Sequence, residues 1–301
     1  MNNLDKNCFI CNGNVFIVSS KHYLKCINCG HEIIEDMETQ SFIINEALSE
    51  KSITKLNLLD KFKQNVLKEC TIAGDFLLDI GSASGKFLYH NKDSFKNYMG
   101  IEVTDECIEF SRKRLGLKIK NNINFVHNTI SVATFWHSLE HMPSKIIESI
   151  LEKINSSSSY STRVIISVPN NDSLQYALFK ESYTYYDPTS HIHQFSVKSL
   201  GLLLQKHGFE KENCFYSFPY SAFGYLQGLM NKINKIHNYL YYRKKRGIEF
   251  SQNIHENILY DIYNYLLLVL FLVPSLLLSI YDFVYINKGA VITACYRIKK
   301  N

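Results

Sequence analysis

The sequence predicts an α/β protein built on a doubly wound sheet, and three observations support that prediction. The run "DFLLDIG" has the length and composition of a buried strand, and "GKFLYH" a few residues later begins a helical pattern. A second strand pattern, "YMGIEV", also leads into a helical pattern. Two C-x2-C pairs near the N-terminus add a small separate module. Alternating strands and helices are typical of a parallel sheet covered on both faces.

The composition is that of a folded chain with a substantial core. Of 301 residues, 46% are hydrophobic and 13% aromatic, enough for one large domain or two smaller ones. The net charge of +5 is mild and the lysines are scattered, which does not by itself imply a nucleic-acid partner. Four isolated cysteines and a start without a signal-peptide pattern predict a cytoplasmic protein. These cysteines are Cys70, Cys107, Cys214 and Cys295.

The N-terminal module has the spacing of a zinc ribbon. Its four cysteines are Cys8, Cys11, Cys26 and Cys29. Four thiolates favour zinc, and a closed four-cysteine site predicts a structural role rather than catalysis. The spacer reads as two short strands, "VFIVSS" and "HYLKC". A redox dithiol and a site without metal remain alternatives, and His31 is expected at the surface rather than as a ligand. Residues 36–70 then read as a helical connector.

The turn after the first main strand indicates the type of ligand. It contains Gly81 and Gly85 but lacks the middle glycine of the dinucleotide fingerprint. Asp79 would repel a phosphate but suits a ligand that carries an amine. Glu102, at the tip of the second strand, is placed to bind both hydroxyls of a ribose. A solvated acid and an ordinary tight turn are the alternatives.

Five segments in order resemble the class I S-adenosylmethionine-dependent methyltransferases. They read "LLDIGSASGKFL", "GIEVTDECIEFSR", "TFWHSLEHMPS", "RVIISVPNNDS" and "DPTSHIHQFSVKSLGLLLQKHGFE". The last resembles a bacterial subgroup whose members often carry an N-terminal cysteine ribbon. The resemblance implies a Rossmann-like seven-stranded sheet, with "FEKENCFYSFPY" as sixth strand and "KGAVITACYRI" as last strand. It also implies S-adenosyl-L-methionine as cofactor.

The resemblance also implies a role for each matching residue. Asp79 would lie near the methionine ammonium, Glu102 would hold the ribose hydroxyls, and His137 would line the pocket near the methyl group. The methionine and ribose would be wrapped by the turn residues Gly81, Ser82, Ala83 and Gly85. This chain departs from the family in the loop after the third strand, where no acid is present and Asn124 or Asn128 would have to contact adenine. Ser131 replaces the family's fourth-strand acid.

A small-molecule acceptor, of a sugar or glycan-related type, is the expected substrate. Methyl transfer to a hydroxyl or carbon needs a base, and the candidates are His141, His191 and His193. In an extended "HIH" segment the last two would lie on one side, with Asp187 as a partner, but no third metal ligand is evident. Capping or shaping a loop is the alternative for these histidines. Three nearby tyrosines are expected either to line the acceptor pocket or to pack in the core: Tyr183, Tyr185 and Tyr186.

An apolar helical insert, residues 219–287, precedes the last strand. Residues 262–280 carry no charge, which approaches a membrane span, but Pro274 predicts two short helices instead. These would pack on the domain, form a homodimer contact, or dip into the inner face of a membrane through residues 262–285. Nearby basic residues would then meet anionic lipid: Arg243, Lys244, Lys245 and Arg246.

The expected organisation and the competing functions are as follows. The catalytic domain spans residues 71–218, after a ribbon over 1–35, and the last strand lies in residues 288–301. A quinone or lipid acceptor at a membrane is one alternative to the glycan-type acceptor. A non-catalytic scaffold is another. RNA methylation is disfavoured because no N-P-P-[YF] site follows the fourth strand and the ribbon is not strongly basic.

Overall fold

The computed structural model describes residues 7–34, 48–71, 74–245, 249–251, 254–286 and 288–299. Residues 36–47 of the predicted connector lie outside the described residues, as does Arg246 of the predicted basic group. The side chains of Lys244 and Lys245 are also outside them. The rest of the predicted connector forms α1 (Glu50–Thr54) and α2 (Leu58–Cys70).

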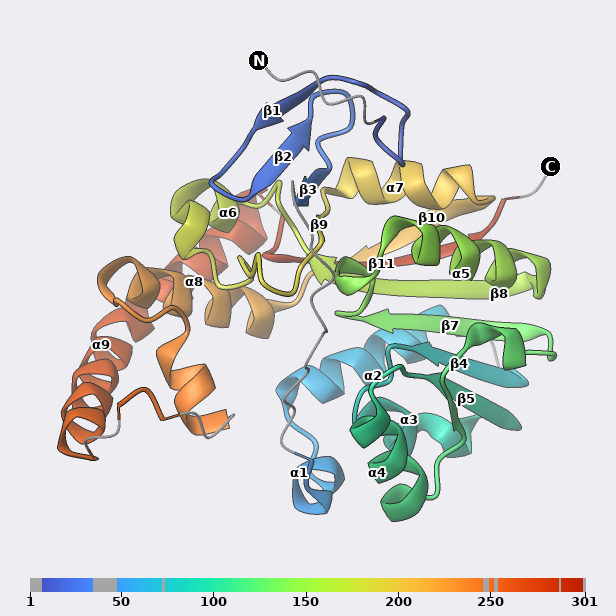
Figure 1. Cartoon of the computed structure of the whole chain (residues 1–301), viewed down its shortest axis with the longest axis horizontal. Coiled ribbons are helices and arrows are strands. Elements are labelled where there is room, and N and C mark those ends of the chain that lie inside the picture. Colours follow the sequence, from blue (N-terminus) through green and yellow to red (C-terminus); the bar gives the residue numbers. More distant parts are fainter. Residues whose placement is uncertain are drawn as a thin grey trace.

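A seven-stranded sheet forms the centre of the molecule, as predicted (Figure 1). Its order is β10-β11-β8-β7-β4-β5-β6, and β11 is antiparallel to both neighbours while the other pairs are parallel. The bounds are β4 (Phe76–Ile80), β5 (Asn97–Ile101), β6 (Ile119–Lys120), β7 (Ile130–Trp136), β8 (Ser158–Pro169), β10 (Phe209–Phe215) and β11 (Val291–Ile298). Chain order reverses on the two sides of β4, so a ligand crevice is expected at its carboxyl end.

Helices cover both faces because side chains alternate along each strand. Leu78 faces one core, shared with α5 (Ser144–Ser156) and α7 (Val197–Lys206). Leu77 faces the other core, shared with α2, α3 (Lys86–Asn91) and α4 (Asp105–Leu115). The near-continuous apolar run of β4 thus reflects burial on both sides.

The cysteine module docks on the domain of the seven-stranded sheet through a small second sheet. Strands β1 (Phe16–Val18), β2 (Tyr23–Cys26) and β3 (Glu32–Ile34) are antiparallel, and β9 (His193–Gln194) adds a fourth strand beside β3. His31 is consequently only 1% exposed, and its Nε2 lies 3.1 Å from His193 Nδ1. The expectation that His31 is a surface residue was wrong, because strand β9 covers this side of the ribbon.

The apolar run around Pro274 forms one long helix rather than the two short ones predicted. The insert follows α6 (Leu174–Phe179), begins within α8 (Phe218–Ile233) and continues into α9, which runs from Ile254 to Tyr281 with Pro274 inside it. One proline removes a single backbone donor, which the rest of this apolar helix tolerates. By length and composition alone, the described helix His255–Ile286 could cross a membrane.

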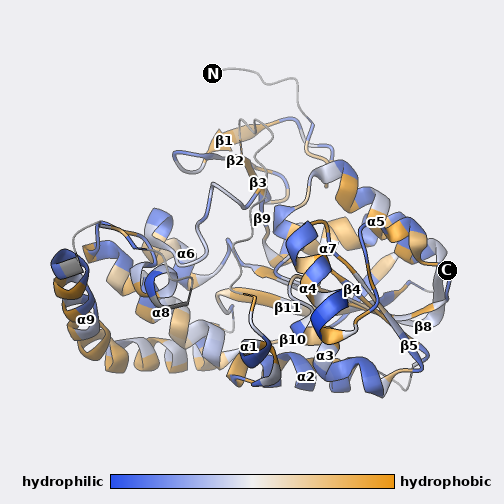
Figure 2. Ribbon diagram, turned by 60° about the horizontal axis from the view of Figure 1, so that its bottom comes forward, coloured by the Kyte–Doolittle hydropathy of each residue, from blue (hydrophilic) through white to orange (hydrophobic). Residues whose placement is uncertain are grey.

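Helix α9 turns its polar side inward and its apolar side outward. Asn264 and Ser279 are fully buried; Asn234 Nδ2 donates to Asn264 Oδ1 at 2.7 Å, and Tyr216 donates to Ser279 O at 3.2 Å. The outward side chains are more than half exposed, and they are Leu259, Ile262, Leu266, Val269, Leu270, Val273 and Leu277. Apolar colour recurs along this helix in Figure 2. This arrangement reverses the usual pattern of a helix in water.

Candidate functional site

The turn from β4 to α3 requires glycine at both ends. Gly81, Ala83 and Gly85 have φ values of 71°, 46° and 77°. A Cβ at Gly81 would lie 2.4 Å from Ser138 Cβ, and one at Gly85 would lie 2.5 Å from Leu117 Cδ1. Ser82 is buried, and its hydroxyl has no hydrogen-bond partner among the described residues. The backbone can therefore approach a ligand closely at the carboxyl edge of the sheet.

Glu102 stabilises this turn through a hydrogen bond to its backbone. It follows β5, is 3% exposed, and its Oε2 accepts from Ala83 N at 2.8 Å. Its Oε1 accepts from the amides of Val103 and Thr104 at 2.8 and 2.9 Å. Each carboxylate oxygen has two lone pairs, so Oε2 can accept one more hydrogen bond from a ligand hydroxyl.

Asp79 places a buried carboxylate under the turn. Its side chain is 2% exposed, and Oδ1 accepts from Thr134 Oγ1 at 2.6 Å. Burial raises the Asp79 pKa to about 6, against the opposing effects of the Thr134 hydrogen bond and the Lys63 charge. Lys63 itself lies over the Trp136 ring, 5.4 Å from its centroid. A cationic ligand group would stabilise the ionised carboxylate, whereas an anionic group would not.

The segment after β7 lies against the glycine turn. Ser138 Oγ donates to Ile80 O at 2.7 Å, and His137 adopts φ of 55°. The His137 ring stacks on Tyr185 at 5.9 Å between centroids and lies 5.2 Å from Tyr220. These contacts place an imidazole between two aromatic rings at the carboxyl edge of the sheet.

A buried acid and two histidines meet beside this segment. Glu140 and His141 belong to the 3-10 turn η3 (Leu139–His141), and His191 precedes β9. One possible ligand atom from each lies within 4.8 Å of the others. Burial raises the pKa of Glu140, but the hydrogen bond and charge of His137 and the other two histidines hold it below its usual range. Burial also lowers the His191 pKa to about 4.

Glu140 was not among the residues singled out from the sequence. Its signal was the L-E-H triplet in "TFWHSLEHMPS", a segment from which only the histidines were predicted to have a role. The triplet gains its meaning only in three dimensions, because His191 comes from a loop fifty residues later. The hydrogen bond from Ile192 N to Glu140 O, at 2.9 Å, fixes that loop against η3.

The other predicted acceptor-side residues divide between site and core. His193 is fully buried, with Nε2 bonded to Met142 O at 3.0 Å and Nδ1 to His31, and burial lowers its pKa. Tyr183 is core, since its hydroxyl donates to Ala290 O. Tyr186 contacts Ser20 of the ribbon, and Tyr185 is the one of the three tyrosines that reaches His137.

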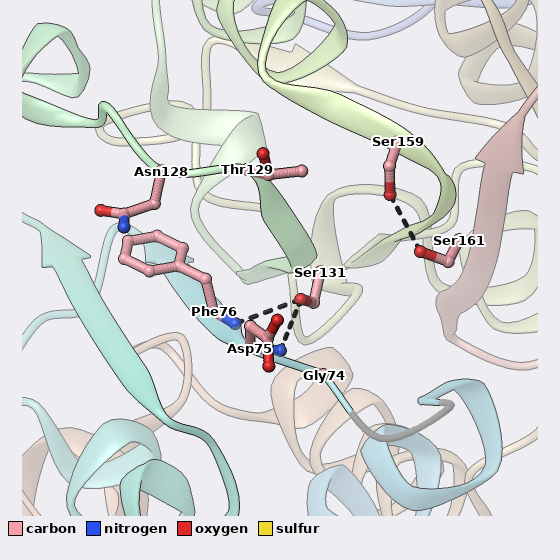
Figure 3. A pocket seen from close by; sticks show the side chains of 8 residues that line it. All are labelled: Gly74, Asp75, Phe76, Asn128, Thr129, Ser131, Ser159 and Ser161. Carbon is pink, nitrogen blue, oxygen red and sulfur yellow. Dashed lines mark hydrogen bonds between the residues drawn. The ribbon is translucent and has the colours of Figure 1, made fainter.

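The remaining polar residues named from the sequence lie away from the glycine turn or in exposed loops. Ser131 Oγ accepts from the amides of Asp75 and Phe76, and it lines a cavity of about 380 Å³ together with Asn128 (Figure 3). This cavity lies at the amino ends of β4, β7 and β8, the edge opposite the glycine turn. Asn128 is therefore wrongly placed for adenine, whereas Asn124 is exposed in the loop after β6. Asp187 accepts from Thr189 and Ser190 within its own turn.

The four N-terminal cysteines converge. Cys8 Sγ lies 3.7 Å from Cys29 Sγ, and Cys11 Sγ lies 3.6 Å from Cys26 Sγ. All four sulfur atoms lie within 4.8 Å of one another, and none is in a disulfide. Tetrahedral zinc with bonds of about 2.3 Å separates its thiolates by about 3.8 Å, so the cluster fits that ion.

Comparison with known proteins gives a family and a fold. The family model described as a methyltransferase domain matches residues 55–213, a little more than half of the chain. No curated protein matches the sequence significantly. A putative sarcosine dimethylglycine methyltransferase from Galdieria sulphuraria has a similar structure, with TM-score 0.52 and 12% identity over 85% of this chain and 92% of that one.

Two further solved structures match over much of the chain. One is an S-adenosylmethionine-dependent methyltransferase from Archaeoglobus fulgidus, with 15% identity, TM-score 0.46, and 82% and 97% of the two chains covered. The other is an S-adenosylmethionine-dependent methyltransferase from Clostridium acetobutylicum, with 9% identity, TM-score 0.46, and 82% and 94% covered. The family match, the seven-stranded sheet and the glycine turn agree. The chain belongs to the methyltransferase-domain family and is a class I S-adenosylmethionine-dependent methyltransferase.

Proposed function

We propose that the protein methylates a small acceptor of a sugar or glycan-related type, at the carboxyl edge of the sheet. The observation that carries this proposal is the arrangement of Asp79 and Glu102 around a turn that needs glycine at both ends. S-adenosylmethionine supplies a methyl group already activated on a sulfonium. The protein then has to align the acceptor with that methyl group and exclude water.

The cofactor-side residues follow from the contacts of the turn. Asp79 would bind the methionine ammonium, because a buried carboxylate with a raised pKa is stabilised by a cation. Glu102 would hold the ribose hydroxyls, and its Oε2 has one lone pair that the backbone amides leave available. His137 would line the methyl side. The methionine and ribose would be wrapped by Gly81, Ser82, Ala83 and Gly85.

The acceptor-side residues follow from the aromatic and imidazole contacts. Tyr185, His137 and Tyr220 offer ring faces that suit a sugar or another flat polar ligand. His141 and His191, with Glu140 beside them, would act on the acceptor hydroxyl. His193 would support them by holding Met142 and the ribbon in position rather than by touching the acceptor.

The cysteine cluster would hold a structural zinc ion. All four positions around the ion would be filled by Cys8, Cys11, Cys26 and Cys29, leaving none for substrate. The ion would fix the β1–β2 hairpin, which in turn pairs through β3 with β9. Zinc would therefore support the loop that carries His191 without joining the reaction.

A lipid or quinone-type acceptor at the inner face of a membrane is the alternative that one observation favours. The outward side of α9 is apolar and exposed along residues 258–281, while its inward side is polar and hydrogen-bonded. Such a surface matches a membrane, or a second copy of the chain, better than water. Flotation with anionic vesicles tests the membrane, and light scattering of the same sample tests the homodimer.

Titration calorimetry with S-adenosylhomocysteine tests the cofactor site. Asp79→Asn and Glu102→Gln should each weaken binding about tenfold, because each removes a charge from the hydrogen bonds to the ligand. Asp105→Asn is the control, an exposed acid three residues beyond Glu102 that should bind as the unaltered protein does. No binding by the folded, zinc-loaded protein would favour a non-catalytic scaffold.

Transfer of labelled methyl from S-adenosylmethionine tests the acceptor class. The panel contains nucleotide-linked sugars, a ubiquinol analogue in vesicles, and a structured RNA. Label in a nucleotide-linked sugar supports the proposal, and label in the quinol alone would replace it by the membrane alternative. Label in RNA would overturn both.

A further inference from the structure

Glu140, His141 and His191 form a close group at the acceptor side of the proposed site. The first two residues lie on η3 at the carboxyl end of β7, and the third lies in the loop before β9. One oxygen or nitrogen from each lies within 4.8 Å of the others. Three such ligands, two imidazoles and one carboxylate, are a recurrent metal-binding set.

The hydrogen bonds of the two histidines orient them as ligands. His141 Nδ1 lies 2.9 Å from Ser190 O, and His191 Nδ1 lies 3.0 Å from Tyr185 O. A carbonyl oxygen only accepts, so each neutral ring carries its proton on Nδ1 and has its lone pair on Nε2. Donation of the second ring nitrogen to a backbone carbonyl is the usual outer-shell arrangement of metal-bound histidine.

Glu140 supplies a second, independent indication. Its side chain is fully buried, and Oε1 lies 3.2 Å from His137 Nδ1. Its other oxygen, Oε2, has no hydrogen-bond partner among the described residues. A buried carboxylate oxygen without a partner is costly, and a bound cation would remove that cost.

We propose that Glu140, His141 and His191 together bind one divalent first-row transition-metal ion at the acceptor side of the site. Imidazole ligands favour zinc, iron, cobalt or nickel over magnesium and calcium, which prefer all-oxygen sites. Three protein ligands leave a coordination position open, unlike the four-cysteine cluster. The inference rests on the proposed function: an acceptor hydroxyl bound at the open position would be polarised and would ionise more readily.

The test uses the full-length protein with one equivalent of zinc already bound at the cysteines. Cobalt(II) is then titrated in, followed by calorimetry and by absorption. A second equivalent should bind without thiolate-to-cobalt charge-transfer bands, because this site has no sulfur. Glu140→Gln and His141→Gln should each weaken that binding about tenfold or more. His127→Gln, at an exposed histidine, is the matched control and should leave it unchanged.

Two results would overturn the inference. One is a single bound equivalent whose spectrum shows thiolate bands. The other is a second equivalent that neither Glu140→Gln nor His141→Gln weakens. His141 is partly exposed, so its variant serves if the Glu140 variant fails to fold. S-adenosylhomocysteine is titrated into the same samples: if it binds while no second metal does, only the metal inference fails, and if it does not bind at all, the proposed function fails.

Discussion

The two clusters of metal-type ligands found among the described residues are held together in different ways. The cysteines come from two knuckles, 8–11 and 26–29, whose spacing by itself brings the sulfur atoms together. Glu140, His141 and His191 are brought together only by the packing of η3 against the loop before β9. The first cluster organises its surroundings, whereas the second depends on them. Loss of a ligand from the first cluster should therefore unfold the structure around it, whereas a change in the packing around the second cluster should weaken ligand binding there.

Loss of one cysteine should have the largest effect. Cys26→Ser should unfold the ribbon and lower the stability of the chain by about 3 kcal/mol or more, because ion binding supplies folding energy to such a module. Thermal melting and hydrogen exchange over residues 7–34 measure the effect. Cys214→Ser, at an exposed cysteine outside the cluster, is the control. Equal melting of the two variants would show that the ribbon folds without its metal.

A substitution in the glycine turn should weaken the second cluster by changing the packing around it. Gly81→Ala would place a Cβ 2.4 Å from Ser138 Cβ, in a backbone with φ of 71°. Displacing Ser138 moves the start of η3, so binding of S-adenosylhomocysteine and of the second cobalt should each weaken about tenfold. Calorimetry of both ligands measures this.

Two other glycines separate the causes of that loss. Gly116 has φ of 63° but open space around its Cβ, so Gly116→Ala reports backbone strain alone. Gly201 lies in α7, and a Cβ added there would have no contact within 4 Å among the described residues outside the helix's own backbone. Gly201→Ala should therefore leave the stability unchanged or raise it slightly. A loss of cobalt binding in Gly116→Ala equal to that in Gly81→Ala would contradict the packing explanation.

Much of the fold and of the cofactor edge could be predicted from local sequence. The cysteine spacing, the β4 turn with Asp79, and Glu102 after β5 are contiguous patterns, and the structure has the strands and turns where those patterns lie. The predicted sixth and last strands are also present, as β10 and β11. Their position in one sheet came from family resemblance, because pairing across eighty residues has no local signal.

The rest depended on contacts between distant segments. His31 was predicted at the surface because the sequence has no local signal for the pairing of β9 with β3. No third ligand for His191 was evident because Glu140 and His141 come from another loop. Asn128 follows the third strand in sequence, yet the chain has already crossed to the opposite edge of the sheet there. Pro274 indicated a break, but the surrounding apolar residues continue the helix.

Cofactor binding should depend on pH through Asp79, which lies under the turn and away from the cysteines. The pKa of Asp79 is raised from an ordinary value near 4 to about 6, so the folded protein without ligand favours the protonated form below that pH. Its contribution to the free energy of unfolding therefore falls as pH rises from about 4 to 6. A ligand ammonium needs the ionised form, so its affinity should change in the opposite direction.

The expected change is roughly a tenfold loss of S-adenosylhomocysteine affinity between pH 7 and pH 5, since one pH unit below a controlling pKa is tenfold. Asp79→Asn should bind more weakly at pH 7 and show a flat profile over the same interval. Calorimetry in buffers of different ionisation enthalpy would also detect the released proton. A pH profile unchanged by the substitution would assign the proton to another group.

The smallest effect is expected from one of the contacts between the ribbon and the rest of the chain, the hydrogen bond between His31 and His193. His193 Nε2 donates to Met142 O, so its Nδ1 accepts the hydrogen bond of His31 Nε2 across 3.1 Å. His31→Phe keeps the ring contacts with Phe9 and Phe195 but removes the donor, and should lower the free energy of unfolding by about 1 kcal/mol. His31→Gln, which keeps an N–H donor, should lower it less. Cobalt affinity at the second cluster should change by less than about threefold in both, because η3 keeps its own hydrogen bonds. A larger change would mean that the ribbon controls the geometry of the acceptor side, and the two clusters would then act as one unit.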